Sequence, residues 1–156
     1  MTVMRHCAVC LPVREGRVLL GLKKRGFGEG KIVEIGGGLE PGETPEEAAI
    51  RETREECGLL ARNLVDHGEV VFEFTGRPQW AIRMRIFVTR DWDGEPVETD
   101  EIRPEWFDVT APPFARMWAD GAHVLPRVLR GERVFLRFLF AEDGETIASV
   151  SPLPPS

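Results

Sequence analysis

Residues 44–57 carry the strongest helix signal in this 156-residue chain. Thr44 is a favoured N-cap residue, Pro45 suits the first helical position, and Glu47 completes a capping box. Gly58 supplies the stop, because glycine readily takes the left-handed conformation that ends many helices. The sequence therefore predicts a helix whose two ends are both marked by local residues.

Three glutamates share one face of this predicted helix. Glu52, Glu55 and Glu56 lie at positions i, i+3 and i+4, which places them within one stripe. Like charges at this spacing weaken a helix by roughly 0.2–0.5 kcal/mol per pair. A solvated acidic face is the common explanation of such a stripe. A divalent cation is the alternative, because Mg²⁺ is bound by carboxylate oxygens and leaves positions open for phosphates.

A longer pattern surrounds the stripe and decides between these explanations. Gly37 is followed after five residues by Glu43 and after seven more by Arg51-Glu52-Thr53-Arg54-Glu55-Glu56-Cys57-Gly58-Leu59. This run resembles the Nudix box at every fixed position. Only Thr53 differs in kind from the bulky aliphatic residue preferred there, and its β-branched side chain can still pack. The chain is therefore identified as similar to the Nudix hydrolase family.

The resemblance implies a fold and a chemistry. The implied fold is an α/β/α sandwich with a mixed central sheet and a Nudix loop–helix–loop. The implied cofactor is Mg²⁺ or Mn²⁺, used to cleave a nucleoside diphosphate-linked substrate with water. Its expected ligands are Glu52, Glu55, Glu56 and the backbone carbonyl near Gly37. Arg51 and Glu43 are expected to orient the loop. Glu101 or a glutamate of the box is expected to act as general base, which makes the expected catalytic set Arg51, Glu52, Glu55, Glu56 and Glu101.

Further segments resemble one group within this family, the hydrolases of oxidised purine nucleoside triphosphates. They are residues 19–28, 71–74, 103–107 and 113–118. That group converts 8-oxo-dGTP and 2-oxo-dATP to monophosphate and pyrophosphate, which clears oxidised nucleotides from the pool used for DNA synthesis. The substrate-binding residues that the resemblance implies are Lys23, Phe27, Val33, Phe72, Trp118 and Asp120. The alternative for the aromatic ones is an ordinary place in the core.

Two departures from that group bear on the choice of base. Val33 stands where the group has an asparagine, and Gly121 replaces the second of two adjacent aspartates, which would leave Asp120 alone. A site that loses polar contacts loses the discrimination they provide. Alternative substrates are therefore ADP-ribose, a sugar nucleotide or a dinucleoside polyphosphate. A non-catalytic nucleotide-binding module is a third reading, which the three surviving glutamates disfavour.

The rest of the chain predicts an α/β fold. Strands are expected at 2–13, 18–22, 32–35, 67–75, 80–90, 133–141 and 145–150. Short helices are expected near 113–119 and 122–130, and loops at 23–31 and across the acidic stretch 91–105. Gly36-Gly37-Gly38 is expected to break the preceding strand. One domain over 1–151 would then be followed by a loose Pro-rich tail at 152–156.

Composition excludes several other classes. A net charge of −6 disfavours binding to a nucleic acid polymer, which needs clustered cations. No apolar run approaches the roughly 20 residues that cross a bilayer, and the start of the chain does not resemble a signal peptide. We therefore expect a cytoplasmic protein, monomeric or homodimeric, with a small-molecule nucleotide as its partner. Cys7 and Cys10 have no matching pair for a zinc site and are expected to be reduced thiols.

Overall fold

The computed structural model describes residues 4–156, so residues 2 and 3 of the first predicted strand lie outside the described part. The strands are β1 (Arg5–Arg14), β2 (Arg17–Lys23), β3 (Ile32–Val33), β4 (Ile35–Gly38), β5 (Leu60–Arg62), β6 (Val65–Phe74), β7 (Ile82–Thr89), β8 (Asp91–Asp93), β9 (Ile102–Asp108), β10 (Val134–Phe140) and β11 (Ile147–Pro152). The helices are α1 (Pro45–Cys57) and α2 (Gly121–Leu129), with 3₁₀ turns at η1 (Pro78–Trp80) and η2 (Phe114–Arg116).

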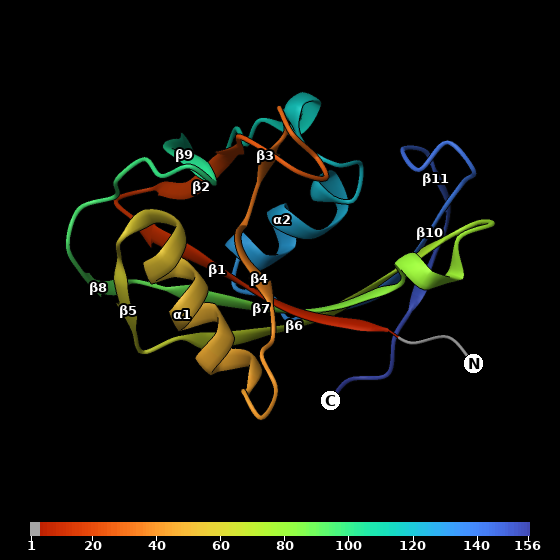
Figure 1. The fold of residues 1–156 in the computed structure, drawn as a ribbon, viewed down its shortest axis with the longest axis horizontal. Helices are drawn as coiled ribbons and strands as arrows, with labels where there is room; N and C mark the ends of the chain where they lie inside the picture. Colours follow the sequence, from red (N-terminus) through yellow and green to blue (C-terminus); the bar gives the residue numbers. More distant parts are fainter. Residues whose placement is uncertain (1–3) are drawn as a thin grey trace.

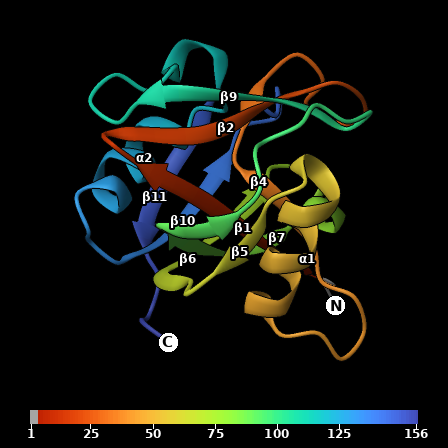
Figure 2. The same ribbon diagram turned by 90° about the vertical axis from the view of Figure 1, so that its left-hand side faces the viewer.

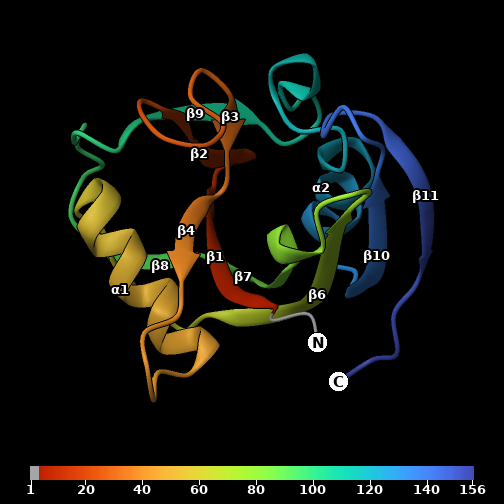
Figure 3. The ribbon, with the colours of Figure 1, turned by 45° about the vertical axis from the view of Figure 1, so that its right-hand side comes forward.

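The central sheet is mixed, as predicted. Its order within the described residues is β11-β10-β6-β7-β1-β2-β3, with β4 also paired to β1 and β9 to β2. Strands β1 and β7 run parallel, as do β6 and β10, while the other pairs are antiparallel. Helices α1 and α2 lie on opposite sides of β1 (Figures 1, 2 and 3). The expected α/β sandwich is confirmed.

Helix α1 begins and ends where its local signals predict. The Thr44 backbone N–H donates to Glu47 Oε1 at 2.9 Å, and the Glu47 N–H donates to Thr44 Oγ1 at 3.1 Å. Gly58 ends the helix with φ of +79°, the left-handed conformation. Thr53 is fully buried and donates its hydroxyl to the Ala49 carbonyl at 2.7 Å, so it packs where the aliphatic residue was preferred.

The three glycines at 36–38 do not break a strand, and this prediction was wrong. They form most of β4, in which Gly36 pairs with Val9 and Gly37 with Ala8 of β1. A Cβ atom at Gly36 would lie 2.1 Å from the Ala8 carbonyl oxygen. Glycine is therefore needed here for the close approach of two backbones, a reason that the sequence alone does not distinguish from a turn.

The acidic stretch 91–105 is also more regular than predicted. It contains β8 and the first half of β9. Trp92 and Ile102 are buried, and β9 pairs with β2 along its whole length. Exposed acidic residues between these anchors give the stretch its loop-like composition. The helix predicted near 113–119 is only the turn η2, whereas the one near 122–130 is confirmed as α2.

The main hydrophobic core lies between the sheet and α2. It includes the buried side chains of Leu11, Leu20, Val70, Leu125 and Phe138. The chain end joins this structure, because Leu153 is buried and donates its N–H to the Phe135 carbonyl at 3.0 Å. The tail is therefore anchored at Leu153 and is less loose than expected. Within residues 4–156, neither helix is long and apolar enough to span a bilayer.

Candidate active site

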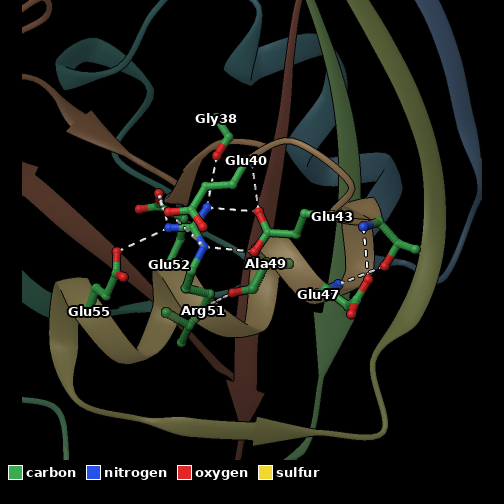
Figure 4. Close-up of polar contacts among 10 residues, drawn as sticks. Gly38, Glu40, Glu43, Glu47, Ala49, Arg51, Glu52 and Glu55 are labelled. Atoms are coloured by element: carbon green, nitrogen blue, oxygen red, sulfur yellow. Dashed lines mark hydrogen bonds and ion pairs between the residues drawn. The ribbon is translucent and has the colours of Figure 1, made fainter.

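Arg51 organises the glutamates around the start of α1 (Figure 4). Its Nε and Nη2 donate to the two carboxylate oxygens of Glu43 at 2.7 and 2.9 Å, and Nη2 also donates to the Gly38 carbonyl at 2.9 Å. Its Nη1 reaches Glu52 at 2.9 Å and Glu55 at 3.1 Å. The guanidinium thereby connects the loop before α1 to the glutamate stripe. The orienting role expected of Arg51 and Glu43 stays a prediction.

Arg51 strongly lowers the pKa of Glu43. Hydrogen bonds from the Arg51 guanidinium and from the Glu40 N–H lower the pKa of the Glu43 carboxyl to about 2. Glu43 therefore stays ionised under all ordinary conditions. A paired, permanently charged carboxylate of this kind is suited to fixing the position of Arg51 and not to exchanging protons.

The surroundings of Glu56 shift its pKa in the opposite direction to that of Glu43. Burial first, and then the nearby charge of Glu52, raise the pKa of the Glu56 carboxyl to about 7. The Gly36 N–H and the charge of Lys23 act against this shift. The negative charge of an ionised Glu56 is therefore only partly compensated by its protein neighbours, and a bound cation would compensate it further.

The donor set around Glu56 fits a hard divalent cation. Glu52 is oriented by Arg51, and a Cβ atom at Gly37 would lie 2.7–2.9 Å from the Glu52 carboxyl group. Only glycine leaves this space, which is open to carboxylate and carbonyl oxygens, the ligands that Mg²⁺ prefers. Among residues 4–156, no group of three or more acidic, cysteine or histidine side chains is arranged so that it could hold a metal ion by itself.

A cavity of about 220 Å³ lies beside this cluster. Its lining contains eight of the site residues expected from the sequence: Lys23, Phe27, Val33, Gly37, Glu56, Phe72, Trp118 and Asp120. These come from β2, the loop after it, β3, β4, α1, β6 and the segment before α2. Arg51, Glu52, Glu55 and Glu101 are not part of the lining. The structure thus places two expected metal ligands, Gly37 and Glu56, and all six expected substrate-binding residues around one space.

Aromatic rings form part of the cavity wall. Phe27 stacks on Trp118 with ring centroids 5.2 Å apart, and the Lys31 ammonium lies 4.5 Å from the Trp118 ring centroid. Phe27 is 62% exposed, whereas Phe72 is buried and packs against Phe138. Phe72 therefore belongs to the core as well as to the cavity. Phe27 has no packing role of that extent, which leaves it available to cover a bound ligand.

Glu101 lies just before β9, close to the end of β2. Its backbone carbonyl accepts the Lys24 N–H at 2.9 Å, and its side chain forms an ion pair with Arg25. That pair lowers the pKa of the Glu101 carboxyl. The charge of Glu101 also raises the pKa of Glu56, so the two carboxylates are near neighbours electrostatically.

Sequence reasoning assigned no role to two charged residues that line the cavity, Arg5 and Glu34, of which Glu34 is the acidic one. Its carboxyl group lies near that of Asp120, which was expected to be alone. Burial and then the Glu34 charge raise the pKa of Asp120 to about 8, and burial also raises the pKa of Glu34. The available signal was a glutamate between the apolar residues Val33 and Ile35. A charged residue in such a strand-like run usually faces solvent, and here it faces a cavity.

Comparison with known proteins places this site among characterised relatives. Residues 4–128 match the family described as NUDIX domain. The chain is 46% identical to the oxidized purine nucleoside triphosphate hydrolase of Danio rerio, over 90% of this chain and 89% of that protein. It is 39% identical to the protein of the same name from Mus musculus, over 97% and 96%. A MutT protein from Bacillus halodurans shares the fold with a TM-score of 0.84, at 24% identity over 95% of this chain and 97% of the other.

Proposed function

The chain belongs to the NUDIX domain family, and on this premise we propose that it hydrolyses purine nucleoside triphosphates, oxidised ones included, to monophosphate and pyrophosphate. The observation that supports the proposal most strongly is that a glutamate of the Nudix box lies in the same cavity as a lysine and several aromatic side chains. The buried Glu56 of the box lines the same cavity as Lys23 and the aromatic wall formed by Phe27, Phe72 and Trp118. The high identity to two hydrolases named for oxidised purine triphosphates supports the same substrate class.

A divalent metal completes this site, and we propose Mg²⁺ or Mn²⁺. The residues that would hold it are Glu52, Glu55 and Glu56 together with the backbone at Gly37. When bound, such an ion neutralises phosphate charge and lowers the pKa of a coordinated water. Glu55 is exposed, and one of its carboxylate oxygens contacts Arg51 Nη1 at 3.1 Å, which leaves its other oxygen for the ion.

The chain's own residues supply binding and positioning. Arg51 holds Glu52 against Gly37, and Lys23 at the end of β2 offers a cation to the phosphates. In the reaction a water oxygen would bond to one of the two phosphorus atoms of the α–β linkage, the bond from that phosphorus to the bridging oxygen would break, and the bridging oxygen would stay on the other phosphate group, which gives monophosphate and pyrophosphate. The proton from water passes to a carboxylate. Glu101 and the glutamates of the box stay candidates for this base, and the ion pair with Arg25 makes Glu101 the weaker base of them.

Product analysis tests the proposal. The protein is incubated with Mg²⁺ or Mn²⁺ and with 8-oxo-dGTP, 2-oxo-dATP, dGTP and dATP, and the nucleotides are separated by chromatography. We expect monophosphate and pyrophosphate in equal amounts, and no reaction after addition of EDTA. If none of the four triphosphates gave monophosphate, the proposal would be refuted.

The same assay separates the other readings. ADP-ribose, a sugar nucleotide and a dinucleoside polyphosphate are run beside the triphosphates, and efficient cleavage of one of these alone would indicate a different Nudix substrate. A purely nucleotide-binding module would turn over none of them, and its ligand affinity would be unaffected by Glu56→Gln.

We also propose that the enzyme is cytoplasmic and is a monomer or homodimer. Localisation in cells and light scattering of the purified protein would test these two proposals.

A further inference from the structure

Glu34 and Asp120 meet in the cavity from distant parts of the chain. Glu34 lies where the backbone leaves its pairing with β2, at Val33, and begins its pairing with β1, at Ile35 (Figure 3). Asp120 directly precedes α2. Because Glu34 stands between two strand pairings, it is not constrained to the in–out alternation of either strand. Its side chain reaches the cavity that Asp120 also lines.

Neither carboxyl group has a structural task that explains its place. Asp120 is at the N-cap position of α2, yet its side chain makes no capping hydrogen bond. It is only 7% exposed, and within residues 4–156 it forms no ion pair and no side-chain hydrogen bond to another residue. No fully buried side-chain oxygen in the described part of the chain lacks a partner, so any unpartnered oxygen of Asp120 is accessible from the cavity, where a ligand can hydrogen-bond to it.

The two carboxyls form a polar group of their own in the cavity. The surrounding wall is otherwise largely apolar and includes Phe74, Met117 and Trp118. The other titratable side chains in the lining are Arg5, Cys7, Lys23 and Glu56. Glu56 responds to the charges of Glu52, Lys23 and Glu101, whereas Asp120 responds to Glu34. Glu34 thus acts on Asp120 within the same cavity that Glu56 and Lys23 line.

The chemistry of this pair selects among bases. An ionised carboxyl group only accepts hydrogen bonds, and a protonated one also donates. Because burial and then the Glu34 charge raise the pKa of Asp120 to about 8, Asp120 is largely protonated near neutral pH. The pair then offers several acceptors and a donor. Guanine presents the complementary edge: two neighbouring N–H donors, at N1 and the 2-amino group, and the O6 acceptor. Adenine places an acceptor at N1.

We propose that Glu34 is a specificity-determining residue of this chain, which acts with Asp120 to bind the N1–H and 2-amino donors of a guanine-type base. The inference rests on the proposed function, since it describes how that same cavity chooses its substrate. Glu34 restores a second carboxyl group to the cavity in spite of the glycine at position 121. Val33 then contributes only apolar surface to the pocket.

Removal of one donor from the substrate tests this assignment. The nucleotides dGTP and dITP differ only in the 2-amino group, so the ratio of their kcat/KM values reports its recognition. We expect a ratio of at least about 10 in the unaltered protein, because a lost hydrogen bond to a buried charged group costs about one to two orders of magnitude. In Glu34→Ala the ratio should fall below about 3, and Glu34→Gln should give an intermediate value. Glu95→Gln, an exposed glutamate outside the cavity, is the matched control and should keep the full ratio.

A binding measurement without catalysis tests the role of Glu34 separately from the proposed hydrolase function. The products dGMP and dIMP are titrated calorimetrically into the same proteins in the absence of metal. Turnover of triphosphates with an equal dGTP:dITP ratio in the unaltered protein and in both Glu34 variants would overturn the assignment and leave the proposed function standing. Absence of turnover would refute the proposed function. The dGMP:dIMP affinity ratio would then decide the role of Glu34, which is upheld if the ratio depends on Glu34 and overturned if it does not. Thermal unfolding of each variant verifies that the fold is retained.

Discussion

Replacing Asp120 with asparagine should remove part of the pH dependence of the free energy of unfolding. The folded protein raises the pKa of this carboxyl to about 8 from an ordinary value of 3.8, through burial and the neighbouring Glu34. Between these two pKa values the folded state binds more protons at Asp120 than the unfolded state does. The free energy of unfolding therefore falls as pH rises through this window, and is highest below it.

The size of the effect follows from the same shift. A group that is protonated in the folded state and ionised in the unfolded state changes the free energy of unfolding by about 1.4 kcal/mol per pH unit. From pH 5.5 to 7.5 the contribution of Asp120 can reach about 2.7 kcal/mol. We expect at least about 1 kcal/mol, because Glu34 and Asp120 share the penalty of their mutual repulsion. Asparagine keeps the shape of the side chain and cannot ionise, so it removes this contribution.

Urea unfolding at several pH values between 5 and 8 measures the effect. The quantity of interest is the difference in free energy of unfolding between Asp120→Asn and the unaltered protein, in which the titration of distant groups cancels. The variant should gain relative stability steadily as the pH rises, and Glu34→Gln should show the same trend. The exposed Asp100→Asn serves as the control. A difference that stays constant from pH 5 to 8 would refute the reasoning about the buried pair.

Three further outcomes are expected. Glu56→Gln should lower turnover by at least about 100-fold in a pyrophosphate-release assay, and retention of a tenth of the activity would contradict its role beside the metal. Arg51→Lys should lower kcat about 10- to 100-fold with little change in thermal stability, because lysine cannot hold both oxygens of Glu43; unchanged kcat would argue against this positioning role. Gly36→Ala should lower the free energy of unfolding by about 2 kcal/mol or more, because its Cβ would collide with the Ala8 carbonyl. A denaturation midpoint equal to that of the unaltered protein would show that the strands can separate without cost.

The bounds of α1 could be predicted from the sequence because the interactions that set them are local. Thr44 and Glu47 bond to each other within one turn, and Gly58 ends the helix through its own backbone conformation. The box could be recognised for a related reason. Its spacing determines which side chains share a helix face, so the stripe of carboxylates can be identified from the sequence without knowing which residues contact it.

Other elements depended on contacts between distant residues. The strands within 91–105 are stabilised by pairing with β5 and β2, and their acidic composition gives no sign of those partners. Gly36 resembled a strand breaker because its reason for being glycine is the backbone of β1. In the stretch 91–105, strand pairing overrides the local preference for a loop. At Gly36, the neighbouring strand explains why the residue is glycine.

The sequence by itself therefore determined the helix, the stripe of glutamates and the family to which they belong. Only the tertiary structure decided what surrounds the base-binding end of the cavity. Val33 and Gly121 predicted a pocket with a single carboxyl group, and the passage of the chain from β2 to β1 brings Glu34 to Asp120. The physical reason is that a charge in a strand-like run has no identifiable surroundings until the fold has closed around it, and burial in those surroundings then raises its pKa.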